Sequence, residues 1–451
     1  MTMSTSALLS SLLCFVCFVT AVYFCLLSWR NLFSPVLLIS VVFPFLYVVS
    51  HIFMSDEVKG SFLLESSYQR LISLATAAFL AYAFGYFTLP SRREPRSIRL
   101  PSTSPLIVAV LFWISFAGWL LFLQRSGGFF TFYSSVHGAA GAWESSSAYL
   151  YYQEYFIIIW TGFLWWIFLH GGYLTTFCKV TMFVGAAGML AHVWFTGDRG
   201  NAIYFALFFF LPIIIWQARR PFLNTSMLVW VYGPILAGCI VLFPHIRHAT
   251  PWGSELSLHE ALKSIERSPL EGSGAFGSEV YVAAAVIEAA RQQRVYDFGR
   301  GWLRPIVNFV PRAVWPEKPG WFGSVDTLEL ARATLGVPIA IGAAPTGLAD
   351  AFVRFGWLAP IAFFFFGCWG RRVWDRAWTD RDFTSLLFLL AYMNGFKHFL
   401  LQGFNLAFYY WLFPVAAFYV LLAIASRVGV FRGPAAFGVG NTPGGRPAGV
   451  R

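Results

Sequence analysis

The sequence predicts an all-α polytopic membrane protein of roughly eleven transmembrane helices with one large, mostly helical outer loop. The 451 residues are 58% hydrophobic and only 12% charged. Such a chain is too apolar to cover a soluble domain with polar surface and too long for one buried core. Apolar runs that could cross a ~30 Å hydrocarbon layer recur along it. Basic residues gather in the short connections between these runs, as they do on the cytoplasmic side of membrane proteins.

The apolar runs define the expected spans. The first covers about 7–29 and is expected to be retained, because it has neither a basic leader nor a small-residue cleavage site. The others cover about 32–54, 71–89, 105–124, 155–174, 179–195, 202–217, 227–244, 356–370, 383–401 and 406–426. The six cysteines lie in or beside these runs, and we interpret them as small hydrophobic residues.

A basic connection after the third run sets the expected orientation. Arg92, Arg93, Arg96 and Arg99 lie close together there and are expected to stay in the cytoplasm. Counting spans from this loop puts the amino terminus outside and the other short basic connections inside. The net charge of +11 is therefore attributed to this bias, and a nucleic-acid partner is not expected.

Four regions follow from this count. An N-terminal transmembrane bundle of about eight spans covers 1–246, and the large outer loop covers 247–355. C-terminal transmembrane helices cover 356–426, and a basic tail covers 427–451, where the abundance of Gly and Pro predicts disorder. Within the loop, Ser278 is expected to cap a helix, and Ser324 to cap another that ends at Gly336. The proline-rich segment 299–322 cannot be regular helix throughout.

Cationic groups accumulate on the expected outer side. Between residues 291 and 318 the loop holds six basic residues, opposed only by Asp297 and Glu317: Arg291, Arg294, Arg300, Arg304, Arg312 and Lys318. The outer halves or rims of the spans hold His192, Arg199, Lys397 and His398. Ionisable groups in a bilayer usually line a cavity, although Arg199 could simply pair with Asp198, and Lys397 and His398 could snorkel outward. Their convergence favours an anionic headgroup that enters from the outer leaflet.

Three stretches carry a resemblance to a known family. They are Pro311-Arg312-Ala313-Val314-Trp315-Pro316-Glu317-Lys318-Pro319, Thr346-Gly347-Leu348-Ala349-Asp350-Ala351-Phe352-Val353-Arg354-Phe355-Gly356, and Gly197-Asp198-Arg199-Gly200. In these motifs and in its architecture the chain resembles the bacterial oligosaccharide repeat-unit polymerases, the Wzy-type O-antigen and exopolysaccharide polymerases. The family pattern favours Glu, Tyr and Asn where this chain has Asp350, Phe352 and Arg354. An acid role for Asp350 therefore stays open.

The resemblance implies a substrate and a reaction. The substrate would be an oligosaccharide linked to a polyprenyl diphosphate such as undecaprenyl diphosphate. The growing glycan would move from one lipid carrier to the non-reducing end of another lipid-linked repeat unit. The enzyme would lie in the bacterial inner membrane with a periplasmic active face. Its partners would be these substrates and membrane lipid, with a chain-length regulator and a flippase as further candidates.

This chemistry assigns roles to the charged residues. A departing diphosphate needs fixed cations, and guanidinium groups bind phosphate oxygens in pairs. Arg199, Arg312 and Lys318 are the first candidates for the donor, and Arg300 and Arg304 for the acceptor. Lys397 and His398 are further diphosphate-binding candidates.

A base is needed for the attacking sugar hydroxyl. The candidates for this base are Asp350, Glu279, His248 and His245. Glu279 has an alternative role, because a carboxylate in a helix's first turn complements the helix dipole. No metal and no cofactor are expected, because no third ligand accompanies His245 and His248.

Three alternatives stay open. A glycan ligase of similar topology would rely on a loop histidine, for which His248 and His259 are candidates. A multi-span glycosyltransferase that uses polyprenyl monophosphate sugars would use Asp56 and Glu57, but it leaves the basic loop unexplained. A lipid or polysaccharide transporter is disfavoured. Transporters commonly carry an internal repeat and polar groups near mid-membrane, whereas this sequence has no evident repeat and its charges lie toward the outer side.

Overall fold

The computed structural model describes part of the chain. The described residues are 5–27, 34–52, 65–89, 103–126, 128, 153–196, 278–310, 315–316, 325–336, 345–404, 407–408, 415–416, 418–419 and 423. The regular elements among them are all helices. The predicted spans at about 202–217 and 227–244, most of that at 406–426 and the basic tail lie outside the described residues.

The N-terminal helices follow the apolar runs. Their bounds are α1 (Thr5–Leu27), α2 (Pro35–Pro44), which continues through a π-helical turn (Phe45–Val49) into α3 (Ser50–Ile52), α5 (Glu65–Thr88), α6 (Pro105–Arg125), α10 (Gln153–Leu169) and α11 (Thr176–Thr196). The third run was expected to start near 71, but α5 starts at Glu65. Its first turns are polar, with Gln69 and Arg70, and so do not register as an apolar run.

The large loop contains four described helices. They are α16 (Ser278–Gln293), α17 (Arg300–Phe309), α18 (Thr327–Leu335) and α19 (Gly347–Phe355). The predicted end of α18 at Gly336 is confirmed, because this residue adopts a left-handed φ of 64°. The predicted cap at Ser324 is wrong. Asp326 caps the helix, with its carboxylate accepting from the backbone N–H groups of Leu328 and Glu329 at 3.0 and 3.1 Å.

The C-terminal part contains two long helices, α20 (Ala359–Asp380) and α21 (Phe383–Gln402). A 3₁₀ turn (Gly356–Leu358) joins α19 to α20, and Gly356 has a φ of 57°, which favours glycine. The expected span at 356–370 is too short, since α20 extends to Asp380. Its last turns carry arginines, including an ion pair between Arg371 and Asp375, and hydropathy alone does not detect them.

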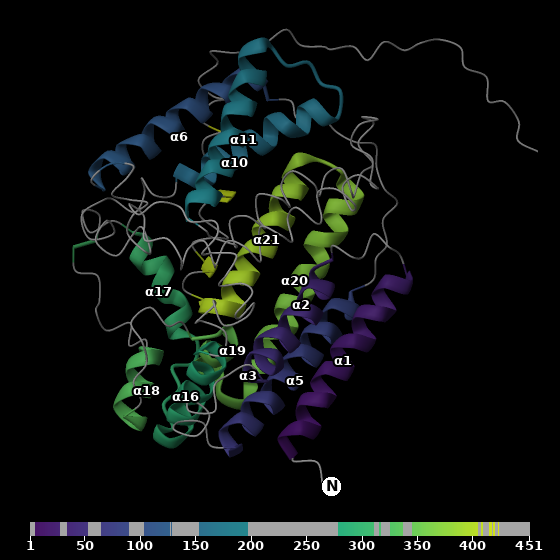
Figure 1. The fold of residues 1–451 in the computed structure, drawn as a ribbon, viewed down its shortest axis with the longest axis vertical. Helices are drawn as coiled ribbons and strands as arrows, with labels where there is room; N and C mark the ends of the chain where they lie inside the picture. The colour runs from purple at the N-terminus through teal and green to yellow at the C-terminus, as the bar shows by residue number, and fades with distance from the viewer. Residues whose placement is uncertain are drawn as a thin grey trace, which may run out of the picture.

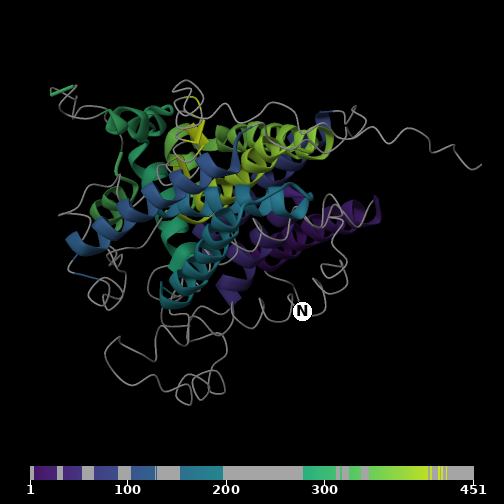
Figure 2. The ribbon, with the colours of Figure 1, turned by 90° about the horizontal axis from the view of Figure 1, so that it is seen from above.

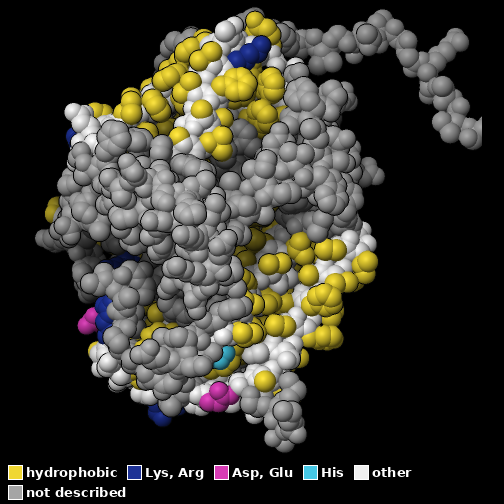
Figure 3. Space-filling model, in the orientation of Figure 1, with side chains coloured by type: hydrophobic (Ala, Val, Ile, Leu, Met, Phe, Trp, Pro, Cys, Tyr) yellow, Lys and Arg dark blue, Asp and Glu magenta, His cyan; other side chains and the backbone are white. Residues whose placement is uncertain are grey.

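Several helices suit a membrane. Among the described residues, five stretches are long and apolar enough to span one: Thr5–Leu27, Pro35–Ile52, Glu65–Thr88, Pro105–Arg125 and Gly347–Asp380. Large apolar side chains on α1 are exposed, including Phe15 at 64% and Phe18 at 66%. Figure 3 shows a hydrophobic surface over this helix. The chain is thus an all-helical protein with the exposed apolar surface of a membrane protein.

Glycines allow α5 and α20 to pack closely. A Cβ atom at Gly85 would lie 2.2 Å from the carbonyl oxygen of Phe364, and one at Gly367 would lie 2.1 Å from that of Tyr82. Small residues at such contacts are typical of membrane helix pairs. The Tyr82 hydroxyl lies 3.1 Å from that of Tyr392, which links this pair to α21.

Several helices begin or end at one end of the described structure. Helices α5 and α20 start at the same end, because Arg70 near the start of α5 pairs with Glu288 on α16, and α16 packs on α19, which leads into α20. Helix α21 returns in the opposite direction. The first residues of α5, the start of α20 and the last residues of α21 therefore meet at one end, together with α16, α18 and α19 (Figure 1). We call this end the loop end. The arginines that end α20 lie at the opposite end.

Helices α6, α10 and α11 form a second packed group. Indole N–H groups link them, from Trp160 to Ser115 Oγ and from Trp113 to Thr181 Oγ1, each at 3.1 Å. The rings of Phe163 and Phe383 lie 4.8 Å apart and join α10 to α21. Seen from above, α1 lies at the edge of the molecule (Figure 2).

Candidate functional site

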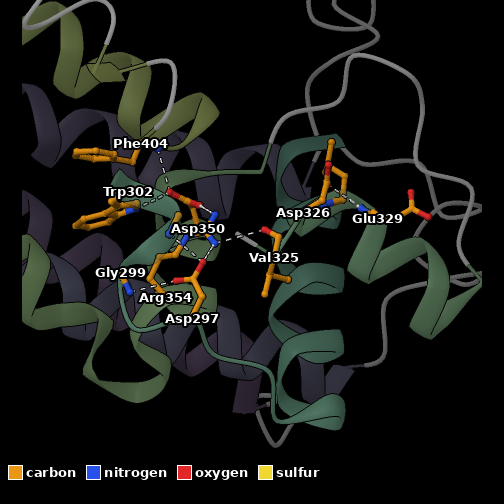
Figure 4. A network of polar contacts seen from close by, with 11 residues as sticks. Asp297, Gly299, Trp302, Val325, Asp326, Glu329, Asp350, Arg354 and Phe404 are labelled. Atoms are coloured by element: carbon orange, nitrogen blue, oxygen red, sulfur yellow. Dashed lines mark hydrogen bonds and ion pairs between the residues drawn. The ribbon is translucent and has the colours of Figure 1, made fainter. Parts of the chain in front are cut away.

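The centre of the loop end is a buried arginine between two carboxylates. Arg354 on α19 forms ion pairs with Asp297, from the turn before α17, and with Asp350, one helical turn earlier. The Arg354 Nη2 to Asp350 Oδ1 distance is 2.9 Å. Exposed fractions are only 2% for Arg354, 4% for Asp350 and 6% for Asp297. Figure 4 shows the group, which we call the Arg354 network.

Asp297 organises the turn that leads into α17. Its two carboxylate oxygens accept the backbone N–H groups of Gly299 and Gly301, each at 3.1 Å. Gly299 has a left-handed φ of 85°, and a Cβ atom at Gly301 would lie 2.2 Å from Cζ of Arg354. The glycine at 301 is therefore what lets the guanidinium lie against the backbone of the turn.

Asp350 ties three segments together. In addition to Arg354, its carboxylate accepts the indole N–H of Trp302 at 2.9 Å and the backbone N–H of Phe404 at 3.0 Å. Trp302 is on α17 and Phe404 follows the end of α21. Both oxygens of Asp350 thus have donors, an arrangement that holds the carboxylate in place.

Aromatic packing surrounds the Arg354 network. The Trp302 ring stacks on Phe404, with centroids 4.5 Å apart, and meets the edge of Phe399 at 6.0 Å. Helix α19 reaches the backbone of α21, because a Cβ atom at Gly347 would lie 2.3 Å from the carbonyl oxygen of Phe399. The first turn of α17, which carries Trp302, is therefore packed directly against the end of α21.

The charges in this network do not cancel. One guanidinium faces two buried carboxylates, and neutral N–H groups from the turn, Trp302 and Phe404 stabilise the remaining negative charge. Such buried groups depend strongly on one another, and removing one partner typically costs about 3–5 kcal/mol. The arrangement is therefore well suited to fixing positions.

Two predicted diphosphate ligands project from the helix that this network holds. Arg300 and Arg304 are one turn apart on α17, and both are exposed. At this spacing two side chains lie on the same face of a helix. Trp302 lies between them in sequence and is partly buried against α21. The exposed face of α17 is thus basic, and its opposite face is anchored.

Two further predicted ligands lie at the same end of the molecule. Lys397 and His398 are in the last turns of α21, and His398 is 9% exposed. The ring Nδ1 of His398 lies 3.0 Å from Oε1 of Gln402. Phe399, the next residue, contacts Trp302. The predicted ligands on α17 and on α21 are distant in sequence, but both helices are held together by the packing of Trp302 on Phe399.

Of the remaining predicted site residues, only Glu279 is among the described residues. Glu279 lies in the first turn of α16, where its carboxylate can complement the helix dipole. Helix α16 packs on α19, which carries Asp350. The candidates Arg199, His248, Arg312 and Lys318 lie outside the described residues, so their roles stay predictions.

A second charged group joins the loop to a span. Glu288 on α16 pairs with Arg70 at the start of α5 and with Arg291, whose Nη2 lies 2.7 Å from Oε1. Burial raises the pKa of Glu288, but hydrogen bonds from Arg291 and Gln292 and the charge of Arg70 outweigh it and lower this pKa overall. This group fixes α16 to the membrane helices.

Sequence reasoning missed the residues that hold the site together. Asp297 was counted only as an opposing charge, Trp302 was not singled out, and Arg354 was noted only as a departure from the family pattern. One local signal existed, because Asp350 and Arg354 have the i, i+4 spacing of a helical ion pair. The partner of Arg354 in the turn, Asp297, lies 57 residues away and leaves no local signal.

Comparisons with known proteins give no identification. No family model matches the chain, and neither curated proteins nor solved structures give a significant match.

Proposed function

We propose that this chain is a lipid-linked oligosaccharide polymerase of the bacterial inner membrane, with its loop end in the periplasm. The observation that supports the proposal best is the fixed basic surface at the loop end. There the exposed pair Arg300 and Arg304 is anchored through Trp302 and the Arg354 network to the end of α21, where Lys397 and His398 lie. Cations fixed beside membrane helices suit the diphosphate of a lipid carrier.

The proposed reaction is a glycosyl transfer between two lipid-linked molecules. A hydroxyl oxygen at the non-reducing end of the acceptor attacks the anomeric carbon of the donor glycan. A new glycosidic C–O bond forms, and the bond from that carbon to the diphosphate oxygen breaks. The polyprenyl diphosphate leaves with the bonding electrons, and the hydroxyl proton passes to a base or to the departing phosphate.

The basic residues divide the work in this proposal. Arg300 and Arg304 bind the acceptor diphosphate, and Lys397 and His398, whose Nζ and Nε2 atoms are buried in the structure, lie at the membrane end of the site. The donor diphosphate is assigned to Arg199, Arg312 and Lys318. Asp350, Glu279 and His248 remain the candidates for the base. The number of donors around Asp350 favours a positioning role for this residue.

The test is a reaction with purified components. The full chain is reconstituted in lipid nanodiscs and given a synthetic polyprenyl-diphosphate-linked repeat unit, without nucleotide or metal. The proposal predicts a ladder of products that grow by whole repeat units. A single transfer to a different acceptor would indicate a ligase, and glycan movement across vesicles without any new bond would indicate a transporter. Either result would overturn the polymerase proposal.

A further inference from the structure

The turn before α17 exposes a large aromatic ring. Phe298 is 82% exposed, more than any other large apolar side chain in the described residues. Its φ of 50° lies in the left-handed region, which is uncommon for residues other than glycine. Asp297 on one side of it is held by Arg354, and Gly299 on the other side donates to Asp297. The turn is therefore fixed in a form that directs this ring outward.

This turn packs against the start of a membrane-spanning helix. The ring of Phe352 contacts Tyr296 of the turn and Trp357 of the 3₁₀ turn before α20. The ring centroids are 6.0 Å and 5.4 Å apart, respectively. A Cβ atom at Gly356 would lie 3.3 Å from the Tyr296 ring. Phe298 is two residues from Tyr296, so it lies near the level at which α20 begins.

Exposed apolar residues continue from that level along α20. Their exposed fractions are 55% for Trp357, 64% for Leu358, 51% for Ile361 and 64% for Phe365. A surface of this kind on a helix fit to span a membrane faces lipid. In a bilayer, the start of such a surface is expected at the level where acyl chains give way to phosphate groups.

Positive charge flanks the exposed ring. Arg294, Arg300 and Arg304 are all exposed, and Leu303, 49% exposed, lies on the same side of α17 as the last two. A segment with aromatic and aliphatic side chains beside arginines has the composition of an interfacial membrane anchor. Arginines near the surface are attracted to anionic lipids.

We infer that the Phe298 turn and α17 dock into the bilayer leaflet at the loop end. The Phe298 ring lies among the acyl chains, and the three arginines contact the phosphates of anionic lipids, which the acceptor diphosphate replaces at Arg300 and Arg304 when it binds. This interaction holds the loop against the membrane and does not depend on the proposed polymerase activity. Its consequence is that Arg300 and Arg304 sit at the depth of a lipid diphosphate, so a lipid-linked substrate can reach them from within the bilayer.

A spin-label experiment measures the depth of the ring directly. Full-length Phe298→Cys carries a nitroxide label in nanodiscs that contain phosphatidylcholine and phosphatidylglycerol, and its accessibility to oxygen and to a water-soluble nickel complex is compared. Phe365→Cys on α20 is the lipid-facing reference, and Ala333→Cys, at an exposed position of α18, is the aqueous reference. The parent chain, treated in the same way, gives the background from its native cysteines.

The inference predicts that position 298 resembles position 365, with high oxygen and low nickel accessibility. It also predicts a shallower label in pure phosphatidylcholine, and the same change when Arg300 and Arg304 are both replaced by Ala but not by Lys. Nickel accessibility at 298 equal to that at 333 would overturn the inference. A label depth that does not depend on phosphatidylglycerol would overturn the part assigned to the arginines. Neither readout requires turnover, so failure here is distinguishable from failure of the polymerase proposal.

Discussion

The indole N–H of Trp302 donates a hydrogen bond to the carboxylate of Asp350, 2.9 Å away and 48 residues further along the chain. The same carboxylate oxygen accepts the backbone N–H of Phe404. One buried oxygen therefore connects the basic helix α17 to α19 and to the end of α21.

Replacing Trp302 with Phe is expected to lower the stability of the loop end. The ring packing is largely kept, but Asp350 loses a donor in a buried position, which costs about 1–3 kcal/mol. Thermal unfolding of the purified chain in nanodiscs measures the change. Trp357→Phe is the matched control, since that ring is 55% exposed and its loss should change stability by about 0.5 kcal/mol or less. Equal effects of the two substitutions would contradict the role given to the Trp302 bond.

Arg354→Ala is expected to be more severe. It leaves two carboxylates buried without their guanidinium, and breaking such a pair costs about 3–5 kcal/mol. Yield of folded protein and its thermal unfolding midpoint measure the loss. Arg371→Ala removes an arginine that also pairs at i, i+4, with Asp375, but both partners are partly exposed. Arg371→Ala is expected to lower the free energy of unfolding by about 1 kcal/mol or less. An equally small change for Arg354→Ala would show that the buried network is not critical.

The Asp350→Asn variant separates a base from a positioning residue. An amide offers one acceptor and introduces donors toward Arg354, Trp302 and the Phe404 N–H, so the variant should disturb α17 and weaken substrate binding together with turnover. The residual activity should keep the wild-type pH profile. Substrate binding and single-turnover rates measured across pH test this. If the variant still binds substrate but turns over far more slowly, and its pH profile loses the fall in rate on the acidic side, Asp350 would be identified as the base.

The Glu288 group gives the loop a pH-dependent attachment. The pKa of Glu288 is lowered in the folded protein relative to the ordinary value of 4.5. Stability from this group is therefore fully present above about pH 4.5 and is lost as the pH falls through the lowered pKa. Unfolding midpoints measured across this range should fall less steeply for Glu288→Gln than for the wild type. Parallel curves for the two proteins would contradict this contribution.

The helices could largely be predicted from the sequence, because apolar runs of sufficient length have few other structures in a membrane. The boundaries were less accurate where polar residues extend a helix beyond the apolar run, as at Glu65 of α5 and Asp380 of α20. Helix α17 was not predicted, because Pro305 lies inside it and three further prolines follow it by residue 319.

The residues of the site were predictable only where chemistry alone selects them. The exposed arginines of α17 stood out as charge beside a membrane, and Asp350 stood out within a motif. The role of Arg354 depends on contact with Asp297, and that contact exists only after α19 has packed against the turn. Gly301 gives no signal in the sequence, because its importance lies in the space that Arg354 needs.

The most direct test of the central claim is product formation by a chain that lacks both Arg300 and Arg304. The double Ala variant, in nanodiscs with the synthetic lipid-linked repeat unit, is predicted to keep the wild-type unfolding midpoint but to form product at least about tenfold more slowly per arginine removed. Arg372→Ala removes an exposed arginine at the opposite end of α20 and should leave the ladder unchanged. A ladder of wild-type length and rate from the double variant would contradict the claim that the loop end binds the lipid diphosphate.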